Sequence, residues 1–159
     1  MGYTHYIVNK KVSDEKFEEF SNACKKLYEN LPEKTNSAGG YFANDKIEIA
    51  GWDGNGKPEF TKEFVSFNGK GEELSHETFY LENKEGFSFC KTARKPYDLL
   101  VVACYLAAMQ ILGSKFSSDG FLRDGTCDYL NEGIDFYNEV MKPKIPITQK
   151  ILWEQYLKD

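Results

Sequence analysis

The chain has few of the residues that build metal centres or disulfide frameworks. Of its 159 residues, two are histidine and four are cysteine. The cysteines are Cys24, Cys90, Cys104 and Cys127. They are widely spaced and include no Cys-x-x-Cys pair, the arrangement most typical of a structural zinc site. We therefore expect no metal site, no cofactor and four free thiols, with Cys24 and Cys104 on the apolar faces of helices.

The chain also lacks an excess of positive charge and a long hydrophobic run. Its net charge is −5, which argues against bulk binding to DNA or to an anionic membrane, because both require a broad cationic face. The apolar run over residues 99–112 is too short to span a bilayer. No secretory signal precedes the first predicted strand. These features predict a cytoplasmic protein whose charged partner is a small anion.

Aromatic residues, in contrast, are abundant. They make up 15% of the chain, with 12 Phe and 10 Tyr, while hydrophobic residues reach 41% and charged residues 28%. This balance is typical of an ordinary globular protein with a single compact core. We expect one domain over residues 1–159. Within it, residues 143–159 carry many apolar side chains and are predicted to dock on the domain or on another subunit as an oligomerisation segment.

Local patterns predict both strands and helices. The predicted strands are residues 3–9, 46–52, 60–67, 76–81 and 87–91, and the predicted turns are 53–56, 68–69 and 117–120. The predicted helices begin after Ser13, at Pro96, near Thr126 or Cys127, and at Ile147. The second of these is apolar nearly all round and should be buried, ending at Gly113.

Strands and helices do not alternate regularly along the chain. We therefore expect an α+β fold with an antiparallel sheet of about four to five strands, packed on one face by a buried central helix and two or three amphipathic helices.

A basic segment immediately before the apolar helix is the most informative local feature. Lys91, Arg94 and Lys95 lie within five residues. Cations at a helix N-terminus interact unfavourably with the helix dipole, at a cost of about 0.3–1 kcal/mol each. The free amides of the first helical turn, which Pro96 suits, attract anions. A bound phosphate or carboxylate would compensate the cations, and so would Asp98 in a purely structural cluster. The pattern leaves both interpretations open.

The ligand interpretation assigns roles to several side chains. The candidate ligand-binding residues are Lys91, Thr92, Arg94, Lys95, Tyr97, His5, His76 and Tyr3. Arg94 suits bidentate contact with a phosphate, and Thr92 adds a hydroxyl donor. His76 lies next to Glu77, and a histidine beside a carboxylate can act as a general base. A structural histidine is the alternative, and no catalytic residue is assigned. Asn68 is interpreted as a reader of a base edge or as a turn residue.

Two longer segments resemble a known family. Met1-Gly2-Tyr3-Thr4-His5-Tyr6 and Phe89-Cys90-Lys91-Thr92-Ala93-Arg94-Lys95-Pro96-Tyr97-Asp98 are similar to segments of a family of small, uncharacterised bacteriophage and prophage proteins. Phe67-Asn68-Gly69, Ser75-His76-Glu77 and Ser118-Asp119-Gly120 fit the same pattern. Ile7 departs from it, because the family commonly has tryptophan at that position. The resemblance implies a protein that acts in the bacterial cytoplasm during infection.

Three functions are compatible with these observations. The first is non-enzymatic sequestration of a nucleotide-like or phosphorylated small molecule, such as a host defence signal, by an oligomeric phage protein. The alternative is a host-takeover protein that acts by protein–protein binding. The second alternative is a small phosphoesterase-type enzyme that uses His5 or His76 with a nearby acid.

Overall fold

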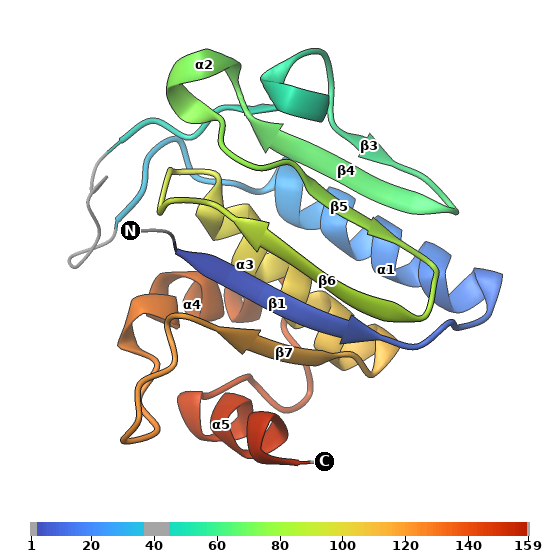
Figure 1. Cartoon of the computed structure of the whole chain (residues 1–159), viewed down its shortest axis with the longest axis vertical. Helices are drawn as coiled ribbons and strands as arrows, with labels where there is room; N and C mark the ends of the chain where they lie inside the picture. Colours follow the sequence, from blue (N-terminus) through green and yellow to red (C-terminus); the bar gives the residue numbers. More distant parts are fainter. Residues whose placement is uncertain (1–2, 37–44, 159) are drawn as a thin grey trace.

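The structure is a computed structural model that describes residues 3–36 and 45–158 (Figure 1). The strands are β1 (Thr4–Asn9), β2 (Ile49–Ala50), β3 (Glu59–Phe60), β4 (Phe64–Gly69), β5 (Phe79–Glu82), β6 (Gly86–Lys91) and β7 (Lys115–Ser118). The helices are α1 (Asp14–Glu29), α2 (Gly71–Leu74), α3 (Asp98–Ala107), α4 (Asn131–Met141) and α5 (Gln149–Leu157). Short helical turns are η1 (Trp52–Gly54), η2 (Ala108–Leu112) and η3 (Asp128–Leu130).

All the strand pairs are antiparallel. One sheet has the order β6-β1-β7, and a four-stranded group places β2, β3 and β5 around β4. Helices α1, α3 and α4 lie behind the strands in Figure 1, and α5 lies beside β7. The predicted α+β class is confirmed, although the strands form a three-stranded and a four-stranded sheet instead of the single sheet that we expected.

The two helices with the clearest local signals form close to the positions that the sequence predicts. The Ser13 hydroxyl accepts a hydrogen bond from the Lys16 amide and caps α1. In α3, every residue from Leu99 to Ala107 is buried. The helix continues through one π turn, η2, and ends at Gly113, whose φ of 70° is left-handed. This apolar helix forms the centre of the core.

Several predicted strands have different bounds. The predicted strand 60–67 is two strands, β3 and β4, because the Thr61 hydroxyl accepts from the amides of Glu63 and Phe64 and closes a turn between them. The predicted strand 46–52 contains only the two-residue strand β2. β7 was not predicted: Ser117 and Ser118, expected in a turn, pair with Tyr6 and His5 of β1.

The C-terminal helix covers the outer edge of the sheet. Through its side-chain amide, Gln155 of α5 accepts from the Phe116 amide at 3.1 Å and donates to the Phe116 carbonyl at 2.6 Å. Leu152 and Ile147 are buried in the core. The α5 segment thus satisfies backbone groups of β7 that an open edge strand would present to solvent. Oligomerisation through this segment stays a prediction.

The four cysteines are free and buried, as predicted. Burial raises the pKa of Cys90, because a thiolate is poorly solvated in the core. Within residues 3–36 and 45–158, no cluster of three or more His, Cys, Asp or Glu residues could hold a metal ion. No helix in that part of the chain has the length and apolar character needed to cross a membrane.

The close approach of α4 to α3 depends on a glycine. A Cβ atom at Gly133 would lie 2.4 Å from Cγ1 of Val102 on α3. We expect Gly133→Ala to destabilise the protein by about 1–3 kcal/mol, because the helices must separate or Val102 must change rotamer. Urea denaturation measures the loss. Asp135→Ala, on the exposed side of the same helix, serves as the control, and an equal effect of both substitutions would contradict this explanation.

Candidate functional site

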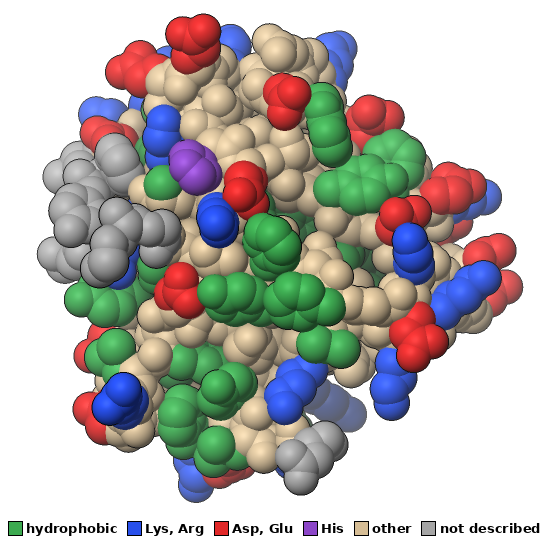
Figure 2. Space-filling model, viewed as in Figure 1, with side chains coloured by type: hydrophobic (Ala, Val, Ile, Leu, Met, Phe, Trp, Pro, Cys, Tyr) green, Lys and Arg blue, Asp and Glu red, His purple; other side chains and the backbone are tan. Residues whose placement is uncertain are grey.

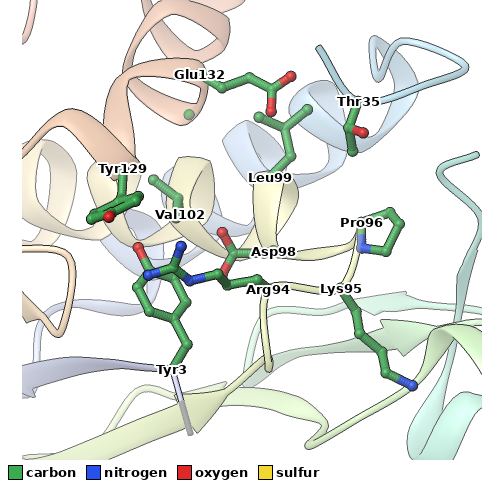
Figure 3. Close-up of a pocket in the computed structure, with 11 residues that line it drawn as sticks. Tyr3, Thr35, Arg94, Lys95, Pro96, Asp98, Leu99, Val102, Tyr129 and Glu132 are labelled. Atoms are coloured by element: carbon green, nitrogen blue, oxygen red, sulfur yellow. The ribbon is translucent and has the colours of Figure 1, made fainter. Parts of the chain in front are cut away.

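A small pocket lies between the start of β1, the loop after β6, the start of α3 and the start of α4. It has a volume of about 50 Å³. The side chains that carry its chemistry are Tyr3, Arg94, Asp98, Tyr129 and Glu132 (Figure 3). It therefore combines one guanidinium, two carboxyl groups and two phenol rings, brought together from three separate stretches of the chain.

Arg94 is held between two aromatic rings. The carbon at the centre of its guanidinium lies 4.4 Å from the ring centroid of Tyr3 and 4.2 Å from that of Tyr129. Both distances are within the range of cation–π contacts. Ala93 and Arg94 have positive φ angles of 53° and 58°, an unusual conformation for side-chain-bearing residues. This loop conformation directs Arg94 toward the pocket.

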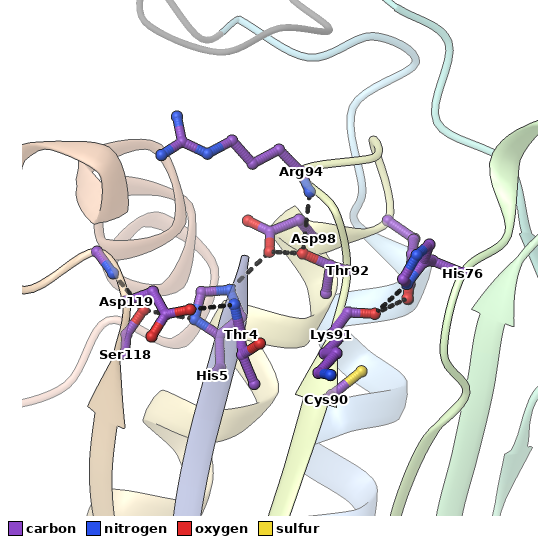
Figure 4. Close-up of polar contacts among 12 residues, drawn as sticks. Thr4, His5, His76, Cys90, Lys91, Thr92, Arg94, Asp98, Ser118 and Asp119 are labelled. Atoms are coloured by element: carbon purple, nitrogen blue, oxygen red, sulfur yellow. Dashed lines mark hydrogen bonds and ion pairs between the residues drawn. The ribbon is translucent and has the colours of Figure 1, made fainter. Parts of the chain in front are cut away.

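A buried hydrogen-bond network lies beneath the pocket (Figure 4). His5 of β1 is fully buried. Its Nε2 lies 2.6 Å from Oδ1 of Asp98, and its Nδ1 lies 2.7 Å from Oγ of Ser118. The Thr92 hydroxyl donates to the same Asp98 oxygen at 2.5 Å. The network fixes the Asp98 carboxylate, which remains 19% exposed, at the edge of the pocket.

The first turn of α3 has no free amides for an anion. The helix begins at Asp98 and not at Pro96. The Asp98 amide donates to the Lys95 carbonyl, the Leu99 amide to Pro96, and those of Leu100 and Val101 to Tyr97. The prediction of an anion site on these amides is therefore wrong. Asp98 itself supplies a negative charge where the helix dipole favours one.

The three cations of the basic segment do not converge. Only the Arg94 guanidinium lies between the aromatic rings of the pocket (Figure 3). Lys95 contributes to the lining, but its ammonium donates to the Glu73 carbonyl at 2.7 Å and points away from Arg94 in Figure 3. Lys91 is an exposed residue at the end of β6. A phosphate cradle made of all three cations is therefore not formed.

Two other predicted ligand residues lie outside the pocket. Tyr97 is buried, and its hydroxyl donates to the Glu77 carbonyl at 2.6 Å. Burial raises the pKa of this phenol. His76 is exposed, and its Nδ1 lies 2.8 Å from the Lys91 carbonyl oxygen. Tyr97 thus has a structural position, and His76 does not face the pocket.

The geometry does not favour histidine-based catalysis. Both ring nitrogens of His5 are engaged within the protein, by Asp98 and Ser118, and its ring is fully buried. A general base must lie within hydrogen-bond reach of the proton that it removes. His5 therefore acts on the pocket only through Asp98, whose carboxylate it positions. Thr92 has the same role, because its hydroxyl donates to the same carboxylate oxygen.

Sequence reasoning did not identify Tyr129 and Glu132 as site residues. Tyr129 belongs to η3 and is 48% exposed. Glu132 of α4 accepts a hydrogen bond from the Asn36 amide. Burial, and secondarily the nearby Asp98 charge, raise the pKa of Glu132. No local sequence pattern could have identified either residue, because the pocket forms only when η3 and α4 meet the basic loop.

A larger groove adjoins the pocket. Its volume is about 1100 Å³, and it shares Leu99, Tyr129 and Glu132 with the pocket. The end of α1 contributes Lys26 to it, and the segment after α1 contributes Lys34. Clefts that bind small molecules typically measure about 300–1,000 Å³. The pocket and groove together therefore offer enough room for a nucleotide-sized molecule.

Comparisons with protein-family models, with curated proteins and with solved structures found no match to this chain.

Proposed function

We propose that this protein binds, without chemical turnover, a nucleotide-like or phosphorylated small molecule at the pocket of Arg94 and the adjoining groove. The observation that carries the proposal is the guanidinium held between Tyr3 and Tyr129. Contacts with both rings restrict the guanidinium, a planar group whose geometry suits a phosphate or carboxylate. The two rings reduce the conformational entropy that Arg94 would otherwise lose on binding.

The carboxyl groups select the rest of the ligand. Asp98 and Glu132 line the same pocket as Arg94. Carboxylates accept hydrogen bonds and repel a second anion. A ligand with one anionic group and several hydroxyl or amino donors satisfies both requirements, whereas a compact polyphosphate does not. A ribose or an exocyclic amine near Asp98 and Glu132, with the anionic group at Arg94, fits this arrangement.

The proposal is tested by isothermal titration against nucleoside monophosphates, cyclic nucleotides and ADP-ribose. We expect heat of binding with at least one of them and a loss of affinity of about 10- to 100-fold in Arg94→Ala, the effect of removing a charge-assisted hydrogen-bond partner. Arg94→Lys keeps the charge but loses the planar donors, so we expect it to bind with an affinity between those of the wild type and Arg94→Ala.

Lys84→Ala is the matched control, because Lys84 is an exposed cation in the turn between β5 and β6. Its affinity is expected to equal that of the wild type. Chromatography of the ligand after incubation separates sequestration from turnover, and we expect the ligand to be recovered intact. No heat with any probe, or an Arg94→Ala variant that binds normally, would refute the proposal.

A protein partner is the second candidate function. The exposed aromatic rings of Phe87 and Phe89 on β6 favour it. These rings are exposed along β6, whereas the pocket lies at the end of the strands, beside the loop that follows β6 (Figure 3). Binding of a protein would therefore persist in Arg94→Ala, and binding of a nucleotide would not.

A further inference from the structure

The outer face of the three-stranded sheet carries exposed aromatic side chains. The nine positions that point outward are Lys91, Phe89 and Phe87 along β6, Thr4, Tyr6 and Val8 along β1, and Asp119, Ser117 and Lys115 along β7 and the residue after it. Phe87 is 63% exposed, Val8 48% and Phe89 47%. No labelled helix covers these strands in Figure 1, and Figure 2 shows hydrophobic side chains gathered on this side of the molecule.

The aromatic rings form a cluster. The ring centroids of Tyr6 and Phe87 are 6.1 Å apart, as are those of Phe87 and Phe89. Isolated apolar side chains are common on protein surfaces, but contiguous aromatic ones mark interaction sites. The nine positions, hereafter the outer face, are therefore a candidate interface.

On the outer face, a positive and a negative side chain lie on opposite sides of β1. Thr4 pairs with Lys91 on one side, and on the other side its carbonyl accepts from the Asp119 amide at 2.9 Å. Neighbouring strands are about 4.8 Å apart, so Lys91 and Asp119 lie at similar distances on opposite sides of β1. A two-fold axis parallel to β1 would place Lys91 of each copy over Asp119 of the other.

The same axis matches large side chains with small ones. Phe89 and Ser117 both lie beside Tyr6, so Phe89 of one copy would cover Ser117 of the second. In the same way, Phe87 would cover the aliphatic part of Lys115, whose ammonium donates to the Lys158 carbonyl at 2.6 Å. A two-fold axis perpendicular to the strands would instead place Phe89 of one copy against Phe89 of the other, and it would leave a gap between the two small Ser117 side chains.

We propose that two copies of this chain form a symmetric dimer through their outer faces, with the two-fold axis parallel to β1. Tyr6 and Val8 lie next to the axis and meet their own counterparts. The arrangement is an aligned packing of two sheets, as in β-sandwiches, and the interface is isologous, so each favourable contact occurs twice. The C-terminal segment borders this face at Lys115, whose ammonium donates to the Lys158 carbonyl.

Charge reversal tests both the dimer and its axis. Analytical ultracentrifugation of the wild type from about 1 to about 100 µM covers the affinities expected for an interface near or below the standard size, and we expect a dimer. Lys91→Asp and Asp119→Lys are each expected to weaken dimerisation at least about 10-fold, because two like-charge contacts replace two attractive ones. An equimolar mixture of the two variants should regain a dimer, because both contacts in the mixed pair are again attractive.

A second substitution keeps the test independent of Asp119, which also accepts hydrogen bonds from the Thr4 amide and the Tyr6 hydroxyl. Phe89→Glu should abolish the dimer while the circular dichroism spectrum stays that of the folded protein. Ile145→Ser, at an exposed apolar residue between α4 and α5, should leave the dimer unchanged. A wild type that is monomeric throughout would overturn the proposal and leave the outer face to a different protein. A dimer that survives Phe89→Glu, or a mixture no stronger than its components, would overturn it as well.

Discussion

Replacing His5 with alanine is expected to lower the free energy of unfolding by about 3–5 kcal/mol, the range for removing a large buried side chain. The substitution removes a fully buried ring that stacks on Phe116 at a centroid distance of 6.1 Å. It also removes one hydrogen-bond partner each from the Asp98 carboxylate and the Ser118 hydroxyl, at 2.6 and 2.7 Å. Each of the two lost hydrogen bonds adds about 0.5–1.5 kcal/mol to the loss. The predicted effect is a large fraction of the stability of a typical domain.

Urea denaturation measures this loss, and the other histidine provides the control. His76 is exposed, and its ring makes one hydrogen bond to a backbone carbonyl, so His76→Ala should change stability by about 0.5 kcal/mol or less. Asp98→Asn keeps the shape of the side chain but removes its charge, and we expect an effect between those of the two histidine variants. A loss below about 1 kcal/mol in His5→Ala would show that the network contributes little.

The second large effect is expected for Asn68→Ala, at about 3–4 kcal/mol. Asn68 is fully buried. Its Oδ1 accepts from the amides of Gly69 and His76 at 2.7 and 3.1 Å. Its Nδ2 donates to the His76 carbonyl and the Thr78 hydroxyl at 2.9 and 3.0 Å. Each hydrogen bond contributes about 0.5–1.5 kcal/mol net. The backbone groups that Asn68 bonds would also be buried without that partner, at a desolvation cost.

Asn55→Ala is the matched control, because Asn55 is an exposed asparagine that follows η1, and it should have little effect on urea denaturation. Asn68→Asp keeps the two acceptor bonds but loses the two donor bonds and places a charge in the core, so it should also destabilise the protein. Equal stability of the wild type and Asn68→Ala would mean that Asn68 is only a turn residue. The interpretation of Asn68 as a reader of a base edge is not supported, because its amide is buried and fully bonded.

The helices were predictable because their signals are local. Ser13 caps α1 through the Lys16 amide three residues later, and Gly113 ends the apolar helix in a left-handed conformation. Both signals lie within a few residues of the backbone groups that they satisfy. Neither depends on contacts with a distant part of the chain.

The strands were less predictable because pairing is non-local. β7 carries the polar sequence Lys-Phe-Ser-Ser and becomes a strand only by pairing with β1. The division of the predicted strand 60–67 depends on hydrogen bonds to the Thr61 hydroxyl. Strand propensity largely reflects packing against neighbours, and a single sequence does not name those neighbours.

The candidate site was likewise predictable only in part. Arg94 and Tyr3 were predicted as ligand residues, and both line the pocket. Lys91 and His76 do not, although their residue types suit an anion site equally well. The positive φ angles of Ala93 and Arg94 turn the Arg94 side chain in a different direction from that of Lys91, which lies only three residues before it. Residue type identifies which side chains are able to bind an anion, and the loop conformation determines which one lies in the pocket.

The sequence by itself determined the α+β class, the buried position of α3 and the presence of a basic segment before it, because composition and local periodicity carry that information. Only the tertiary structure could show that Asp98 already compensates the helix dipole and that Tyr129 and Glu132 complete the pocket. Those contacts join segments far apart in the chain. Their geometry follows from packing and backbone dihedral angles, which no local sequence pattern encodes.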